Sequence, residues 1–248
     1  MYKGQNIGKV YDCVGGRATV ISYLKKNSVV VEFECGTQVT STITSLIRGK
    51  TRNPNSPSLL GVGFIGVGKF SSVDTVIYNV WCNMLKRCYD RNNRYYSCYG
   101  GDGVYVADSW NNFQNFADWY DSQDKEEGWQ LDKDLLVLGN KVYSKEHCLL
   151  IPRGLNMLIQ KRKVGVCQLP GVTKHGDRYR AQISTEKWEK GSEYLGIFVT
   201  PELAHKTYID KKKEIVIEKA MEWEGRISDR VLQALLDYGR NLKYGWEK

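Results

Sequence analysis

The segment Arg178-Tyr-Arg-Ala-Gln-Ile-Ser184 alternates polar and apolar side chains. Successive side chains of a β-strand point to opposite faces of a sheet, so this alternation predicts a half-buried strand. Its buried face would carry Tyr179, Ala181 and Ile183, and its exposed face would carry basic and hydrogen-bonding side chains. We therefore expect a sheet near the C-terminal end of the chain, with one basic surface.

The residues after this strand continue the same unit. A turn is expected over 185–191, followed by a partner strand from Tyr194 to Phe198. Thr200-Pro201 is typical of a helix start, because threonine caps the first turn and proline fits the first helical position. An apolar stripe at helical spacing predicts a last helix over 229–241.

The N-terminal part contains two β-branched runs, Ala18–Leu24 and Ser28–Glu34, with a turn-like Lys-Lys-Asn break between them. Such runs bounded by turn signals predict paired strands. We expect a small β barrel of the SH3-like kind within residues 1–72. A stretch rich in glycine and proline, from Gly49 onward, would form its linker.

The middle of the chain mixes helical and strand patterns. Apolar spacing predicts a helix over 73–94, and an aromatic-rich pattern predicts a second over 110–121 whose rings form core. A strand is predicted over 130–137, and Ser144 is expected to cap a helix that begins near Lys145. Together with the two ends, these elements predict an α+β fold.

The composition is typical of a soluble globular chain of 248 residues, with 42% hydrophobic and 26% charged residues. No apolar stretch is long enough for a membrane span, and the N-terminus lacks the apolar core of a secretory signal. The cysteines number 7 and form no CxxC pair, which indicates reduced thiols rather than a disulfide scaffold or a standard zinc site. We expect a cytoplasmic protein with no membrane partner.

The net charge of +8 is unevenly distributed. It is +5 over residues 1–75, −3 over 76–150 and +6 over 151–248. Basic ends suit a polyanion, because each Lys or Arg near a phosphate releases a condensed counterion. An acidic middle suits a metal-assisted site, which needs carboxylates. The alternative interpretation is that a charge of this size serves only solubility.

Residues 171–208 resemble the AP2/ERF DNA-binding domain. The matching stretches are Gly171-Val-Thr-Lys, Tyr179-Arg-Ala-Gln-Ile, Tyr194-Leu-Gly-Ile-Phe, Thr200-Pro-Glu-Leu-Ala and Tyr208. The resemblance covers about 40 residues and implies a three-stranded sheet that reads the major groove of double-stranded DNA, with a helix behind it. It would lie in a C-terminal domain spanning 165–248, which also contains the last helix.

Carried over by position, the resemblance implies a set of DNA-binding residues: Thr173, Lys174, His175, Arg178, Arg180, Gln182, Ser184 and Tyr194. The sequence departs from the plant family, which has Arg and Trp where this chain has Thr173, Ser184 and Tyr194. We therefore expect contacts to the phosphate backbone, through Lys174, Arg178 and Arg180, more than base reading.

A second resemblance covers about residues 81–152. Its elements are Trp81-Cys-Asn-Met-Leu-Lys-Arg-Cys-Tyr, Tyr99-Gly-Gly-Asp-Gly-Val, Trp110 with Asn115-Phe, Leu131-Asp-Lys-Asp, Gly139-Asn and Tyr143-Ser-Lys-Glu-His-Cys. They resemble bacteriophage HNH-type (ββα-metal) endonuclease-like proteins, many of which carry an AP2 domain at the C-terminus. The resemblance implies a nuclease-like domain over 73–160. It also implies a homing-type or nicking endonuclease of double-stranded DNA, acting in the bacterial host cytoplasm.

An HNH site needs a general base on a strand and ligands for one divalent cation. By position, Asp132 and His147 would hold Mg²⁺ or Mn²⁺, and Asp134, two residues along the strand, is a further candidate ligand for the ion. Lys133 replaces the usual histidine base, and Asn140 corresponds to the loop asparagine. A structural zinc site is not expected, because the spacing of the cysteines is not typical of one: Cys82, Cys88, Cys98 and Cys148.

Three roles stay open for Lys133. It contacts phosphate while another group is the base, it is itself the base, or the site is inactive and the fold is kept for binding. The rival function is a catalytically degenerate DNA-binding or protein-binding phage factor. An inhibitor of a host protein is a further alternative that the sequence neither supports nor excludes.

Overall fold

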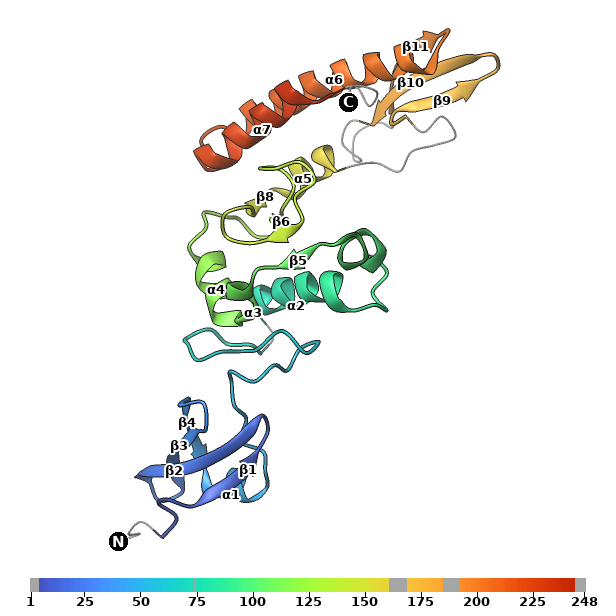
Figure 1. Ribbon diagram of the computed structural model, residues 1–248. Coiled ribbons are helices and arrows are strands. Elements are labelled where there is room, and N and C mark those ends of the chain that lie inside the picture. Colours follow the sequence, from blue (N-terminus) through green and yellow to red (C-terminus); the bar gives the residue numbers. More distant parts are fainter. Residues whose placement is uncertain (1–4, 74, 161–168, 185–191, 244–248) are drawn as a thin grey trace. The chain divides into compact units, whose positions relative to one another are not determined.

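The computed structural model describes residues 5–73, 75–160, 169–184 and 192–243 (Figure 1). Its mixed helices and small sheets confirm the α+β class. The chain divides into two compact units. Unit 1 comprises residues 1–122 and 141–144, and unit 2 comprises 123–140 and 145–248. The expected division at 1–72, 73–160 and 165–248 stays a prediction.

Unit 1 begins with an antiparallel sheet in the order β1-β2-β3-β4, followed by a short helix. The elements are β1 (Val10–Cys13), β2 (Gly16–Lys25), β3 (Ser28–Phe33), β4 (Gln38–Thr42) and α1 (Ile43–Ile47). The core consists of alternate strand residues and one helix residue: Ala18, Val20, Val29, Val31, Phe33 and Leu46. The two β-branched runs therefore form the central hairpin, as predicted.

The expected barrel is not closed in the described part of the chain. No pairing joins β1 to β4, and α1 contacts both of these edge strands instead. The cause is local. The Thr42 side chain accepts a hydrogen bond from the backbone N–H of Ser45 and so caps α1 directly after β4. Strand β4 thus ends before it can extend along β1.

The rest of unit 1 is built around buried aromatic side chains. Its elements are α2 (Val76–Tyr89), the 3-10 turns η1 (Tyr96–Cys98) and η2 (Gly100–Asp102), β5 (Tyr105–Val106), α3 (Asp108–Asn111), α4 (Phe113–Asp121) and β7 (Val142–Tyr143). Strands β5 and β7 pair in parallel. Trp81, Trp110, Phe113 and Phe116 are buried, which confirms their core role. The Trp81 indole donates to the Trp110 carbonyl at 2.7 Å.

Two helix boundaries in this region were predicted wrongly. Helix α2 ends at Tyr89 rather than at residue 94, because the Asp90 carboxylate takes the Asn92 amide and starts a turn. The helix expected over 110–121 is two helices, because Asn112 has an extended backbone and its side chain caps α4 at Gln114.

Unit 2 contains a two-stranded sheet and a three-stranded sheet with long helices. Its elements are β6 (Gln130–Asp132), β8 (Leu149–Ile151), α5 (Arg153–Ile159), β9 (Val172–His175), β10 (Arg178–Ser184), β11 (Ser192–Phe198), α6 (Pro201–Glu222) and α7 (Asp229–Asn241). The bounds of β10 and α7 are those predicted from the sequence. Thr200 caps α6 with Pro201 at its first position. The turn expected over 185–191 lies outside the described residues. Among the described helices, none is both long and apolar enough to cross a membrane.

Candidate functional site

The inner face of the β9–β10–β11 sheet is covered by α6. Ala181 packs with Val172 and Ala204, and Ile183 packs with Tyr208. The chain entering β9 approaches α6 closely: a Cβ on Gly171, which has φ +75°, would lie 2.0 Å from the Tyr208 ring. Only glycine fits this position, since it tolerates both the positive φ and the contact. The helix is thereby held against one face of the sheet.

The outer face follows from the strand register. Because paired residues share a face, Arg178 stands beside His175, Arg180 beside Thr173, and Gln182 beside Tyr194. The described strand positions of this face are Thr173, His175, Arg178, Arg180, Gln182, Ser184, Ser192, Tyr194 and Ile197. This set holds two arginines and no carboxylate. It contains every predicted DNA-binding residue except one.

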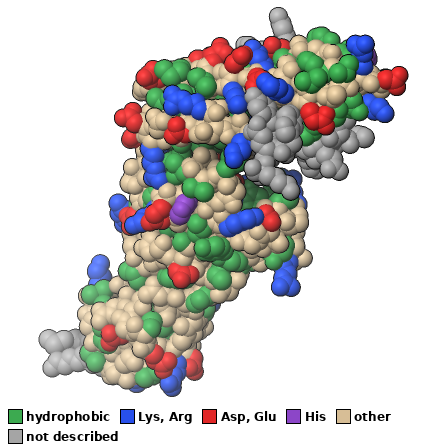
Figure 2. Space-filling view, turned by 45° about the horizontal axis from the view of Figure 1, so that its top comes forward, with side chains coloured by type: hydrophobic (Ala, Val, Ile, Leu, Met, Phe, Trp, Pro, Cys, Tyr) green, Lys and Arg blue, Asp and Glu red, His purple; other side chains and the backbone are tan. Residues whose placement is uncertain are grey.

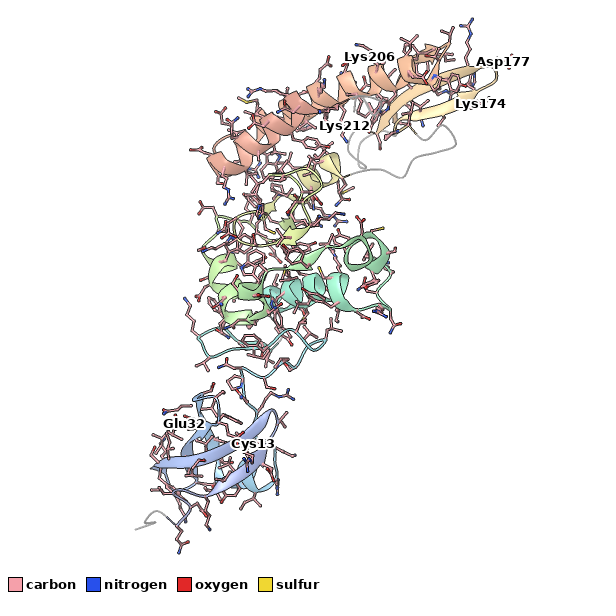
Figure 3. All side chains as sticks on the ribbon, viewed as in Figure 1. Cys13, Glu32, Lys174, Asp177, Lys206 and Lys212 are labelled. Carbon is pink, nitrogen blue, oxygen red and sulfur yellow. The ribbon has the colours of Figure 1, made fainter. Side chains whose placement is uncertain are left out.

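The exception is Lys174, which pairs with Tyr179 and so belongs to the helix side of the sheet. Its side chain is exposed near the β9–β10 hairpin, where Figure 3 labels it together with Asp177. A step of one residue along a strand reverses the face, so Lys174 and the two outer arginines point to opposite sides. We therefore leave Lys174 out of the outer face.

A β-bulge in β11 places Ile197 on the outer face, whereas strict alternation from Tyr194 would place it on the helix side. The register shifts between Ala181 and Gln182, and the extra residue opposite them is Leu195. Leu195 packs into the core under the sheet, and the following Gly196 adopts φ +133°. The bulge lets Tyr194 and Ile197, three positions apart, share the outer face. Gly196 is the only feature of the sequence that indicates this bulge.

Two outer side chains are coupled. A guanidinium nitrogen of Arg180, Nη2, lies 3.1 Å from His175 Nδ1. Arginine can only donate, so His175 accepts at Nδ1 in this arrangement. The Arg180 Nε–H is buried and has no hydrogen-bond partner among the described residues.

The second candidate site lies where β6 ends. Oδ1 of Asp132 accepts the backbone N–H of Asp134 at 2.9 Å and that of Leu135 at 2.7 Å. These bonds turn the chain and end the strand at Asp132, so the strand predicted over 130–137 was too long. Asp134 consequently lies in the turn, and it does not alternate with Asp132 along a strand.

Lys133 and Asn140 close the loop that follows. The Lys133 ammonium, 7% exposed as a residue, donates to the Asn140 carbonyl at 2.7 Å and to Oδ1 of Asp134 at 2.7 Å. The Asn140 amide donates back to the Lys133 carbonyl at 2.8 Å. Because Lys133 Nζ acts here as a donor to two oxygens, this geometry gives it a loop-closing role.

His147 does not lie on a helix. Residues 145–147 form a turn, and the helix expected from Lys145 does not form. Only five residues separate the end of β7 from the start of β8, which leaves no room for a helix of useful length. The β6–β8 register pairs Asp132 with Leu149, two residues after His147. The half-buried histidine therefore lies in the turn that leads into the partner strand of Asp132.

The electrostatics of Asp132 suit a nearby cation. Burial raises the pKa of its carboxyl, while the amide hydrogen bonds from Leu135 and Asp134 act to lower it. Carboxylate oxygens are ligands that suit Mg²⁺ and Mn²⁺, whereas an imidazole suits softer transition metals. Within the described ranges, no group of three or more His, Cys, Asp or Glu side chains is arranged to hold a metal ion.

Comparison of the chain with protein-family models, with curated proteins and with solved structures finds no match. The resemblances to the AP2/ERF domain and to HNH-type proteins stay predictions from the residues.

Proposed function

We propose that the chain binds double-stranded DNA through the outer face of the β9–β10–β11 sheet. The observation that carries the proposal is charge: Arg178 and Arg180 stand on a face whose described strand positions hold no carboxylate. DNA phosphates attract such cations, and binding releases condensed counterions. Guanidinium groups also donate charge-assisted hydrogen bonds to phosphate oxygens.

The helices of unit 2 offer a contrast. Along α6 and α7, basic and acidic side chains are interspersed (Figure 2). Lys206 pairs with Asp210, and Arg240 pairs with Asp237. Neighbouring acids weaken the attraction of these cations for phosphate, so the sheet is the favoured DNA contact.

The finer fold assignments belong to the same proposal. Three antiparallel strands backed by one long helix support an AP2/ERF-like C-terminal part. Four strands whose edges are bridged by α1 support an SH3-like N-terminal part. The chemistry of phosphate binding does not depend on either assignment.

The test is a duplex-binding titration at several salt concentrations. Replacing Arg178 and Arg180 together with Ala should weaken binding and reduce the slope of log K against log salt by about 2, from about 0.9 per phosphate contact. The control is the pair Lys206→Ala and Arg240→Ala, which removes the same charge from ion-paired positions on the helices. An unchanged slope in the Arg178/Arg180 variant, or an equal loss in the control, would remove the sheet from the interface.

A second candidate function is metal-dependent cleavage of the bound DNA. The observation that favours it is the desolvated Asp132 carboxylate, whose strand partner follows the His147 turn. Asp132 and His147 would hold one Mg²⁺ or Mn²⁺, and a bound ion of this kind stabilises negative charge on a phosphate. Lys133 and Asn140 would hold the loop that positions Asp132. If cleavage is absent, the chain is the degenerate binding factor.

Plasmid nicking with Mg²⁺ or Mn²⁺ tests this second candidate. Asp132→Asn keeps an oxygen acceptor for the turn and removes the charge, so it should abolish nicking and leave DNA binding intact. His147→Ala should do the same, whereas Asp118→Asn, at an exposed position of α4, should be fully active. A wild-type chain that shifts DNA on a gel without nicking it would exclude the enzyme.

A further inference from the structure

Unit 1 contains an arginine whose charge is surrounded by tyrosines. Arg87 is half-buried at the end of α2, with its guanidinium carbon 5.4 Å from the ring centre of Tyr99 and 5.6 Å from that of Tyr95. It also donates to the hydroxyl of Tyr143, which is 2% exposed. Burial acts to lower the pKa of Arg87, and interactions with these three tyrosines act to raise it.

These tyrosines do not neutralise Arg87. Burial raises the pKa of Tyr143 well above its ordinary range, so its hydroxyl stays protonated at neutral pH. Phenol rings attract a guanidinium through their π faces without cancelling its charge. Desolvated charges in proteins are normally paired, so a half-buried arginine whose interaction partners among the described residues are phenols favours an anion from outside the chain.

More basic side chains surround this cluster. The guanidinium of Arg94 lies 4.5 Å from the ring centre of Tyr95 and donates to its hydroxyl. Arg91 and Lys86 are exposed on the same short stretch of chain. The two acids nearby are engaged locally. Asp90 accepts the Asn92 amide, and Asp102 pairs with Lys141. We call Arg87, Arg91, Arg94, Tyr95 and Tyr99 the arginine–tyrosine surface.

Close packing holds this surface in place before any ligand binds. A Cβ on Gly100 would lie 1.9 Å from the Cys88 carbonyl, so the turns η1 and η2 lie directly against the end of α2 (Figure 1). A preorganised surface loses little conformational entropy when it binds a ligand. Tyr95 is 41% exposed within it, and the guanidinium groups of Arg87 and Arg94 both lie over its ring.

We propose that the arginine–tyrosine surface binds single-stranded nucleic acid. Exposed aromatic rings stack on unpaired bases, and guanidinium groups bind the neighbouring phosphates and also stack on bases. Bases within a duplex are already stacked and cannot cover Tyr95 in this way. This surface is separate from the outer face of the C-terminal sheet and prefers a different form of nucleic acid.

The test uses the full chain with a fluorescein-labelled oligo-dT of 20 nucleotides, followed by fluorescence anisotropy. The wild type should bind it. Tyr95→Ala and Arg94→Ala should each weaken binding on the order of 10-fold, and Tyr95→Phe, which keeps the ring, should retain it. Arg17→Ala, which removes an exposed arginine ion-paired to Glu34, is the matched control and should bind normally.

Duplex binding by the same variants separates this proposal from the proposed function. Tyr95→Ala should bind duplex like the wild type, and the Arg178/Arg180 double variant should still bind oligo-dT. The proposal is overturned if the wild type does not bind oligo-dT, or if Tyr95→Ala binds it normally. It is also overturned if poly-glutamate competes with oligo-dT as well as unlabelled oligo-dT does. Thermal melting of each variant verifies that the fold is intact.

Discussion

Two regions of unit 2 carry the candidate chemistry, and different forces hold them. The C-terminal sheet is held to α6 by apolar packing around Ala181 and Ile183. The loop from Asp132 to Asn140 is held by a polar network centred on Lys133. Apolar packing is non-directional and leaves a periodic pattern in the sequence. A polar network depends on particular partners and leaves no such pattern.

The largest effect is expected where the sheet meets its helix most closely. Gly171→Ala should destabilise the chain by about 3 kcal/mol, because it combines a positive φ with a Cβ placed 2.0 Å from the Tyr208 ring. Gly176→Ala is the control, since that glycine has φ +60° but nothing within 4 Å of its Cβ, and should cost about 1 kcal/mol. Urea unfolding measures both. Equal losses would mean that packing on Tyr208 is not tight.

The second-largest loss of stability is expected in the polar loop from Asp132 to Asn140. Lys133→Met keeps the apolar stem but leaves the buried Asn140 carbonyl without its donor, for a loss of about 2 kcal/mol. Lys145→Met, at a largely exposed position, should change stability by less than about 0.5 kcal/mol. The free energy of unfolding and limited proteolysis of residues 132–140 are the measurements. A Lys133→Met variant as stable as the wild type would mean that the network adds nothing to apolar packing.

The sheet should also lose stability in mild acid, by less than either preceding change. His205 is buried on α6, where Nδ1 donates to the Pro170 carbonyl, and burial lowers its pKa. The unfolded state therefore takes up a proton at a higher pH than the folded state does. Stability should fall as the pH drops from the ordinary histidine value near 6.5 toward the lowered pKa. His205→Asn retains a donor without titrating, so its melting temperature should vary less over this range. Identical pH profiles of the melting temperature for the two proteins would mean that a group other than His205 causes the loss of stability in acid.

The smallest effect concerns the two faces of the sheet. Lys174→Ala should weaken duplex binding less than 2-fold, since Lys174 pairs with Tyr179 on the helix side. Arg178→Ala removes an outer-face cation and should reduce affinity several-fold. The comparison requires only two binding curves at one salt concentration. A larger loss for Lys174→Ala would mean that DNA contacts the hairpin from its other side.

The sequence predicted helices and strands well wherever apolar side chains recur at a regular spacing and are buried on one face. The alternation from Arg178 to Ser184 and the stripe over 229–241 produced correct bounds. Prediction was poorer where one side chain bonds the backbone. Asp132 ends β6 and Asn112 divides the aromatic helix, each by capturing amide hydrogens. Such bonds depend on local conformation, which a hydrophobic pattern does not encode.

The candidate sites show the same division. The outer-face residues of β10 followed directly from alternation, and the bulge at Leu195 could be inferred only from the neighbouring glycine. The position of His147 depended on whether 145–147 forms a helix or a turn. The spacing from Asp132 is compatible with both. The hydrogen bond between Arg87 and Tyr143 gave no recognisable pattern, because the two residues are brought together from distant parts of the sequence.

The chain passes between its two units three times, after residues 122, 140 and 144. The passage over 141–144 gives unit 1 its strand β7, between two segments that belong to unit 2. No single cut in the gene can therefore separate the units intact. A fragment ending at 122 lacks β7, and a fragment beginning at 145 lacks β6 with its loop. Gain or loss of one unit by recombination would need a matched pair of junctions, so the two units are expected to be inherited together.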